Sequence, residues 1–412
     1  MQLNYSKLGE YIELVSHRNT DHHYGESDVR GVSNNKEIIP TKANNKSRAF
    51  NNFYVVSPND FIYNSRTSRM GEKVGFGFND TEKTIITSFN NTVFKVKNEL
   101  LLPRYLFMWF KRPEFDRYAR FHSWGSSTEI FSWSEMCSVE LPVPSIQKQQ
   151  EIVKEYSAVV NRIKLNAQLN KKLGETAQAL YKNWFVDFEF PNKNGQPYKS
   201  SGGKMVHNKE LDQDIPDGFS SFYLGDKLDL IKSPIRKKDI NEETKYVPID
   251  CLPKKHLFIK KYRNSNEANS SLILFKEKDI LIGAMRVYFH RVCLSHFDGV
   301  TRGTTFVLRS RNVSDLFFLL ILCNQESTIS YANSASKGTT MPYAVWENEF
   351  EKLRILFPTD RLLFLFNQLI DPILKTILNH SKEEENLKRI SHLLLSKISK
   401  DETFQTSHLK DQ

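Results

Sequence analysis

Two acidic residues and a lysine come closest in this sequence to a hydrolytic metal site. Pro216-Asp217 is followed by Glu243-Thr244-Lys245. This imitates a P-D…E-x-K site, in which two carboxylates hold a hard cation and the lysine steadies an attacking water. Pro216-Asp217-Gly218 is also ordinary turn chemistry, and Glu243 lies in a polar run before a β-like stretch. The turn interpretation is favoured, so we expect no catalytic residue and no metal site in this chain.

Other enzymatic motifs are missing from the sequence. There is no D/N/S-P-P-aromatic loop of the kind that holds the amino group of a flipped base for methylation. There is no G-x-x-x-x-G-K-[ST] phosphate loop, and "GFGFND" from Gly75 is an aromatic-glycine turn rather than a cofactor loop. We therefore expect the chain to bind no cofactor and to catalyse neither methylation nor ATP hydrolysis.

Residues able to hold DNA gather in polar loops. Phosphates are bound by lysine and arginine, and base edges are read by arginine, lysine, asparagine or glutamine on exposed loops. The alternative for each such residue is a solvated surface charge. The candidates come from the loops 64–73 and 283–291, and from the turns "SFNN", "TRGTT" and "SKGTTM": Arg66, Arg69, Lys73, Asn90, Asn91, Arg286, Arg291, Arg302 and Lys337.

The composition favours a cytosolic partner that is a polyanion. The 412 residues carry a net charge of +10, which indicates nucleic acid first and an anionic membrane surface second. The longest apolar run, Leu316–Leu322, is too short to span a bilayer, and no signal peptide is visible. The four cysteines form no C-x-x-C pair, as expected for reduced residues of a cytoplasmic protein.

The elements that must position the loops occur twice. "GSSTEIFSW" from Gly125 to Trp133 has a blurred copy, "GTTMPYAVW", from Gly338 to Trp346, and both ends lie 213 residues apart. The register continues outward, since "SFNNTVF" from Ser88 meets "TRGTTFV" from Thr301. Such a long period predicts a duplicated domain of mixed α/β structure, with the two tryptophans as core anchors rather than base-stacking residues.

Each copy is followed by a long helical pattern. The second includes Pro372, which should either kink the helix or begin its main segment. The first follows Ser145 as a plausible N-cap and covers about 57 Å if fully helical. Helices this long need a partner, so the two apolar stripes are expected to pack as an antiparallel coiled coil, although each could instead pack on its own domain. The first stripe comprises Val153, Tyr156, Val160, Ile163, Leu169, Leu173, Ala177, Leu180 and Trp184.

An ordered series of segments resembles the specificity subunits of type I restriction–modification systems. "LPVPSIQKQQEIV" from Leu141, "NWFVDFEF" from Asn183, "KSSGGKMV" from Lys199 and "IPDGFSSFYLGD" from Ile215 resemble the central region of that family. "LLLSKISKDE" from Leu393 resembles its C-terminal conserved region. The sequence departs from the pattern where "QKQQ" after Pro144 is matched only by "DRLL" after Pro358.

The resemblance implies a non-catalytic DNA-specificity subunit with two tandem target-recognition domains separated by two long antiparallel helices. Each domain is expected to read one half of a bipartite double-stranded target. Two methyltransferase subunits and motor–nuclease subunits would be the partners, and S-adenosylmethionine, ATP and Mg²⁺ would bind to them. Alternatives are the same architecture in a related phage-defence or orphan modification system, and a self-contained nuclease or methyltransferase. The expected boundaries are 1–144 and 218–358 for the recognition domains, 145–190 and 359–402 for the helices, 191–217 for a linker and 403–412 for a tail.

Overall fold

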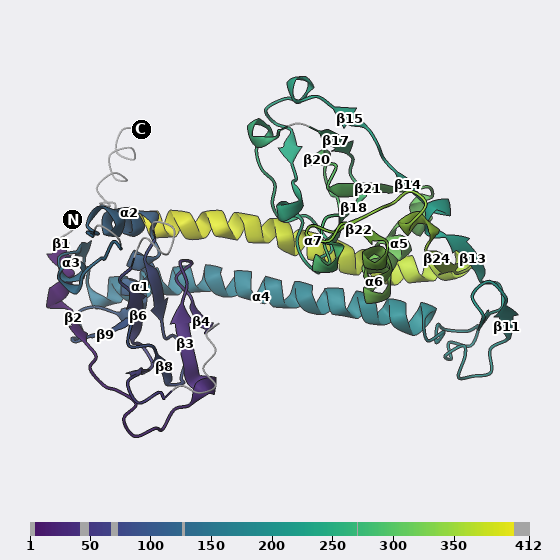
Figure 1. Ribbon diagram of the computed structural model, residues 1–412. Coiled ribbons are helices and arrows are strands. Elements are labelled where there is room, and N and C mark those ends of the chain that lie inside the picture. The colour runs from purple at the N-terminus through teal and green to yellow at the C-terminus, as the bar shows by residue number, and fades with distance from the viewer. Residues whose placement is uncertain (1–4, 42–48, 67–72, 126–127, 270, 399–412) are drawn as a thin grey trace, which may run out of the picture. The chain divides into compact units, whose positions relative to one another are not determined.

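The protein forms two compact units joined by two long helices. The computed structural model describes residues 5–41, 49–66, 73–125, 128–269 and 271–398 (Figure 1). The first unit comprises residues 1–163 and 385–412, and the second comprises residues 164–384. The helices α4 (Ile146–Phe185) and α7 (Asp360–Lys397) each have one end in each unit.

The first unit packs short helices against β-sheets. Its helices are α1 (Pro103–Phe110), α2 (Pro113–Phe121) and α3 (Trp133–Cys137). Its strands are β1 (Tyr5–Lys7), β2 (Ile12–Leu14), β3 (Val29–Val32), β4 (Ile38–Pro40), β5 (Tyr54–Val56), β6 (Phe61–Asn64), β7 (Gly75–Phe78), β8 (Ile85–Thr87), β9 (Thr92–Val96) and β10 (Glu140–Pro142).

The second unit contains the same kinds of element. Its short helices are α5 (Leu316–Cys323) and α6 (Glu326–Ser334). Its strands are β11 (Met205–Asn208), β12 (Gln213–Pro216), β13 (Ser220–Tyr223), β14 (Leu228–Leu230), β15 (Pro234–Ile235), β16 (Lys245–Tyr246), β17 (Leu272–Phe275), β18 (Ile280–Gly283), β19 (Val292–Leu294), β20 (Gly299–Arg302), β21 (Thr305–Ser310), β22 (Ser336–Lys337), β23 (Tyr343–Ala344) and β24 (Arg354–Phe357).

The two units share one topology, so the duplication expected from the sequence is confirmed. The sheet β2-β9-β6-β7 of the first unit corresponds to β14-β21-β18-β19 of the second. Each second sheet contains one parallel pair, β3 with β8 and β16 with β20. The chain enters and leaves each unit through neighbouring antiparallel strands, β1 with β10 and β13 with β24. The edge strands differ, because β4 extends β3 in the first unit whereas β15 extends β17 in the second.

The central strand of each unit separates two cores. In β6, Phe61 and Tyr63 face the core formed with the helices, and Ile62 faces the core between the sheets. In β18, Ile282 faces the core formed with the helices, and Leu281 faces the core between the sheets. This alternation follows from the two-residue period of a strand and fixes the register of the sheet.

At the turn before β9, the residues that correspond in the structure differ by one position from those paired in the sequence. The hydroxyl of Thr87 donates to Arg30 O at 2.9 Å, and Thr301 donates to Val247 O at 2.7 Å. Thr87 therefore corresponds to Thr301, whereas the ungapped sequence comparison had paired Ser88 with Thr301. Buried hydroxyl groups need a hydrogen-bond partner, and this need fixes the correspondence of Thr87 and Thr301. The sequence alone does not show which carbonyl group each hydroxyl contacts.

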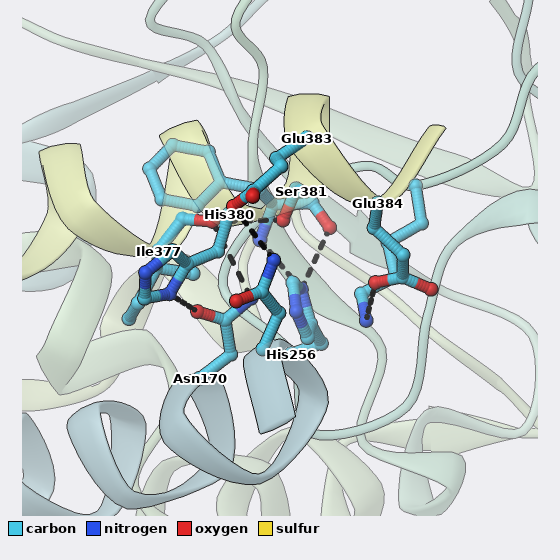
Figure 2. A network of polar contacts seen from close by, with 10 residues as sticks. Asn170, His256, Ile377, His380, Ser381, Glu383 and Glu384 are labelled. Carbon is cyan, nitrogen blue, oxygen red and sulfur yellow. Dashed lines mark hydrogen bonds and ion pairs between the residues drawn. The ribbon is translucent and has the colours of Figure 1, made fainter. Parts of the chain in front are cut away.

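Helices α4 and α7 pack antiparallel, as expected, because Asn166 contacts Glu383 and Asn170 contacts His380. Figure 2 shows the contact between Asn170 and His380. His380 of α7 donates through Nδ1 to Asn170 Oδ1 at 2.9 Å, and Asn166 Nδ2 donates to Glu383 Oε2 at 2.8 Å. Both asparagines are buried, whereas Leu169, placed in the stripe by its spacing, is 40% exposed. After Ile163 the buried face of α4 no longer follows the apolar residues. Asn166 and Asn170, both hydrogen-bonded to α7, occupy the buried positions instead.

Helix α7 continues through Pro372, so the alternative in which its main segment begins there is wrong. Within the described residues it is the one helix long and apolar enough to cross a membrane by length and composition, with a mean hydropathy of 1.2 over 18 residues. Leu363, Phe366 and Ile370 of this helix are buried in the core of the second unit. Its apolar stripe is therefore used in packing.

The segment 191–217 is more ordered than a linker with little regular structure. Strands β11 and β12 form an antiparallel hairpin within it. Lys204 Nζ lies 3.0 Å from Asp217 Oδ2, and Lys245 Nζ lies 4.3 Å from the centre of the Phe297 ring. Two residues of the P-D…E-x-K spacing thus make separate local contacts.

The starts of the two long helices differ at Gln149 of α4. Its fully buried side chain accepts from Leu102 N and donates to Leu100 O and Pro144 O, each at 2.8 Å. It thereby ties the loop before α1 to the first turn of α4. In the second unit the corresponding residue, Leu363, is apolar and buried.

We expect Gln149→Leu to lower the free energy of unfolding of the first unit by about 2–5 kcal/mol, because it leaves buried polar groups without partners. Gln150→Leu is the matched control, because Gln150 is the next residue of α4 and its side chain is exposed. This substitution should change the free energy of unfolding by no more than about 0.5 kcal/mol. Urea unfolding of both variants measures the difference. Equal stability of the two variants would contradict the anchoring role of Gln149.

The second unit should lose stability in acid because of two histidines. Burial lowers the pKa of His256 to about 4, with Lys260 acting in the same direction and Glu384 opposing it. Burial, with Lys382 and Lys245, lowers the pKa of His296 to about 4 as well. Since both pKa values fall below the unfolded value, the stabilisation is complete above about pH 6.5 and is lost as the pH falls towards 4.

We expect the melting temperature to drop between pH 7 and pH 4.5, and this drop to shrink when His256 and His296 are both replaced by glutamine. His23→Gln, at an exposed histidine of the first unit, serves as the control and should leave the drop unchanged. Calorimetry at the two pH values provides the comparison. An undiminished drop in the double variant would rule out these two groups as its source.

Candidate nucleic-acid interface

Two loops and a turn meet at the end of strand β6 in the first unit. Phe131 N donates to Ser65 O at 2.8 Å, which joins the loop after β6 to the segment after α2. Trp124 and Ile130 exchange two backbone hydrogen bonds of 3.2 and 3.0 Å, so this segment is a small hairpin. The turn 88–91 leads into β9 opposite the end of β6, where Tyr63 pairs with Thr92.

The second unit repeats these connections with different residues. Ala344 N donates to Ala284 O at 2.9 Å, and Ala284 N donates to Thr304 O at 2.9 Å. Lys337 pairs with Tyr343 across the hairpin of β22 and β23. The backbone of the junction is therefore the same in both units, while its side chains differ.

Three residues in each unit lie side by side across this junction. In the first unit Ile130 pairs with Arg66 on one side and Trp124 on the other. In the second unit Tyr343 pairs with Met285 and Lys337. Residues directly opposite on antiparallel strands project from the same face with Cβ atoms about 5 Å apart. We call Arg66, Ile130 and Trp124 the first row, and Met285, Tyr343 and Lys337 the second row.

The repeated glycine of the opening motif shapes the tip of the first hairpin. Gly125 has φ +146°, and a Cβ atom there would lie 2.1 Å from Thr128 O. No other residue fits without moving the backbone. Gly338 also has a left-handed φ of +89°. The duplicated glycine therefore supplies the backbone conformation that this position requires in both units.

The rows expose side chains that soluble proteins usually bury. Trp124 is 69% exposed, Tyr343 is 52% exposed, and Phe121, just before the first hairpin, is 75% exposed. Trp133 and Trp346, by contrast, pack in their cores, and the Trp133 ring lies 5.5 Å from the Phe94 ring in a tilted arrangement. Aromatic side chains on an exposed ribbon suit contact with bases.

The predicted DNA-binding residues fall into three groups. Arg66, Lys73, Asn90, Arg302 and Lys337 are exposed on the loops that form this junction. Asn91 donates to Thr87 Oγ1 at 2.7 Å, and Arg291 donates to Ile249 O at 2.7 Å and Leu252 O at 2.6 Å. These two side chains hold their own loops, so we leave them out of the candidate interface.

Arg286 is half-buried, with its backbone N donating to Pro342 O, and Arg69 lies outside the described residues.

The sequence reasoning missed Trp124, Ile130, Met285 and Tyr343. Trp124 was visible as a large aromatic residue beside a turn glycine, outside any apolar period. Ile130 and Tyr343 occupy the same position of the repeated motif, but only the cross-strand pairing shows which residues lie beside them.

A basic hollow of about 670 Å³ adjoins the same end of the first unit. It is lined in part by Lys73, Arg117, Arg120 and Phe121. Lys36, also in its wall, has its Nζ 2.5 Å from Asp116 Oδ1; burial lowers the pKa of Lys36, and Asp116 opposes this shift. Asp116 thus satisfies the buried lysine. At the rim Arg117 pairs with Glu114 and Arg120 pairs with Glu129, and the exposed Lys73 adds positive charge that suits phosphate.

Comparisons with known proteins agree on one family. The model of the type I restriction modification DNA specificity domain matches residues 11–175. The MjaIX type I restriction enzyme specificity subunit of Methanocaldococcus jannaschii is 28% identical over 308 residues, covering 72% of this chain and 68% of that protein. The HindI specificity subunit of Haemophilus influenzae is 26% identical over 182 residues, covering 44% and 39%.

The fold is also found in a solved structure. The S subunit of a type I restriction-modification system from M. genitalium has a TM-score of 0.57, with 13% identity and coverage of 97% of both chains. At this identity the likeness concerns the fold, which includes two β-rich domains and two long helices packed antiparallel.

Proposed function

Because this chain belongs to the DNA specificity subunits of type I restriction–modification systems, we propose that each of its two units binds one half of a bipartite double-stranded DNA target. The chain is the non-catalytic specificity component of such a system. Each half-site would be contacted by the junction at the end of β6 or of β18. We propose that the recognition domains expected at 1–144 and 218–358 lie within these two units.

One observation carries this proposal: the two junctions have the same backbone bonding and different side chains. Phe131 N to Ser65 O and Ala344 N to Ala284 O are corresponding hydrogen bonds. Arg66 and Met285 are corresponding residues of unlike chemistry. A common scaffold with unlike surfaces suits the reading of two different short sequences, because base readout depends on side chains presented on a rigid frame.

We further propose that the long helices dock the methyltransferase subunits. In the second unit α4 exposes Leu165 and Leu169, one turn apart, and α7 exposes Phe364 at 61%. Exposed apolar residues at helical spacing suit the binding of a partner helix. In this proposal the protein assembles into a type I restriction–modification complex. S-adenosylmethionine, ATP and Mg²⁺ would bind to the methyltransferase and motor–nuclease subunits, and the complex would act in the cytoplasm.

Selection from a pool of random duplexes tests the proposed function. The full-length chain, bound to its methyltransferase subunits, should enrich two short defined segments separated by a gap of undefined sequence. Enrichment of one uninterrupted segment, or of no sequence at all, would contradict the proposal.

Binding should depend strongly on salt, because the net charge of +10 displaces counterions from the DNA. For about six phosphate contacts the affinity should fall roughly 10³-fold between 50 and 200 mM salt. Titration of a selected duplex at several salt concentrations gives the slope. A flat affinity over this range would remove electrostatics as the role of the positive charge.

A further inference from the structure

We propose that the two rows are the base-reading elements, and that they read their half-sites with the order of cationic and apolar groups reversed. The first row carries a cation at the β6 side and an aromatic ring at the hairpin side, as Arg66, Ile130 and Trp124. The second carries a thioether at the β18 side and a cation at the hairpin side, as Met285, Tyr343 and Lys337. This inference rests on the proposed function and deepens it.

The dimensions of a row match the groove it would enter. Neighbouring strands lie about 4.8 Å apart, so the outer side chains of three strands are about 10 Å apart. The major groove of B-form DNA is about 12 Å wide and admits a two-stranded β-ribbon. The hairpins that contain Trp124 and Lys337 are ribbons of this kind.

Five of the six side chains in the rows are exposed, and Met285 is half-buried. Arg66 and Lys337 are exposed, Trp124 is 69% exposed and Ile130 is 44% exposed. The hydrogen bonds that join the strands of each row are made by backbone atoms.

The chemistry of each position predicts a class of base. Arginine and lysine donate to O6 and N7 of guanine, whereas apolar side chains contact the methyl group of thymine. Arg66 and Lys337 would therefore each specify guanine. Trp124 and Met285, at the opposite ends of the two rows, would favour thymine.

Two substitutions and two controls test the rows. Lys337→Met should lower the preference for guanine at one position of the second half-site by about 10- to 100-fold. Trp124→Lys should create a guanine preference in the first half-site. Lys337→Arg should retain the guanine preference. Lys238→Met, at an exposed lysine of the second unit outside the row, should leave every base preference unchanged.

The readout is the relative affinity of each folded variant for all single-base changes of the selected target. If Lys337→Met weakens binding equally to all these duplexes, Lys337 contacts phosphate and the inference is wrong. If Trp124→Lys leaves the first half-site preference unchanged, the first row does not read bases. A wild-type chain that selects no split target would instead refute the proposed function, so the two failures are distinguishable.

Discussion

A chain whose first unit is replaced by a copy of the second should bind a target containing the second half-site twice. The graft would replace residues 8–139 by residues 224–353. These limits correspond, because Leu8 N donates to Val139 O at 2.8 Å and Leu224 N donates to Leu353 O at 2.9 Å. The affinity for the original target should fall by about 10³-fold or more, the usual difference between specific and non-specific binding. Selection from random duplexes identifies the new target.

The reciprocal exchange is the matched control. A chain with two first units should select the first half-site twice, and a chain with both units exchanged should keep both half-sites. If the exchanged chains are folded and still select the original target, recognition lies outside the β-rich parts of the units, and the proposed division of labour fails.

Lengthening both long helices should widen the gap between the half-sites without changing the half-sites. An insertion near Ala167, in the middle of α4, would separate Asn166 from Asn170 and disturb their contacts with α7. Four helix-forming residues are better added after Ile163 in α4 and after Glu384 in α7, where the two units meet along the chain. Contacts within each unit are then preserved.

The expected change follows from helix geometry. Four residues add about 6 Å and exceed one turn by only about 0.4 residue, so the helix faces nearly keep their direction. With base pairs about 3.4 Å apart, the gap should grow by one or two base pairs. Two residues in each helix, as a control, rotate the following segment by about 200° and should abolish tight binding. An unchanged gap in an active four-residue variant would mean that the helices do not set the spacing.

Much of the architecture could be predicted from patterns that depend on burial. The duplication, the mixed α/β units and the two long helices all follow from apolar periodicity and from the repeated Gly125 and Gly338 hairpins. Ser145, the expected start of α4, accepts from Gln149 N at 3.0 Å in the first turn of the helix. These features are local, or they repeat, and the sequence therefore shows them directly.

The rest depends on side-chain hydrogen bonds and pairings between distant segments. Asn166 and Asn170 are polar residues in a buried seam, and only their partners on α7 explain this position. Arg291 was expected to contact DNA because it is basic and follows a loop, yet it tethers two carbonyl groups. Trp124 became a candidate only when its partner Ile130 placed it in a row with Arg66.

The most direct test of the account compares Arg66→Ala with Arg302→Ala, one exposed arginine from each unit. The measurement is the affinity of each variant for every single-base change across the whole selected target. We expect each variant to lose about 1–3 kcal/mol of discrimination in one half-site and none in the other, with the affected half-site differing between the two variants. Loss of discrimination in the same half-site, or in both half-sites for each variant, would contradict the claim that each unit reads its own half of the target.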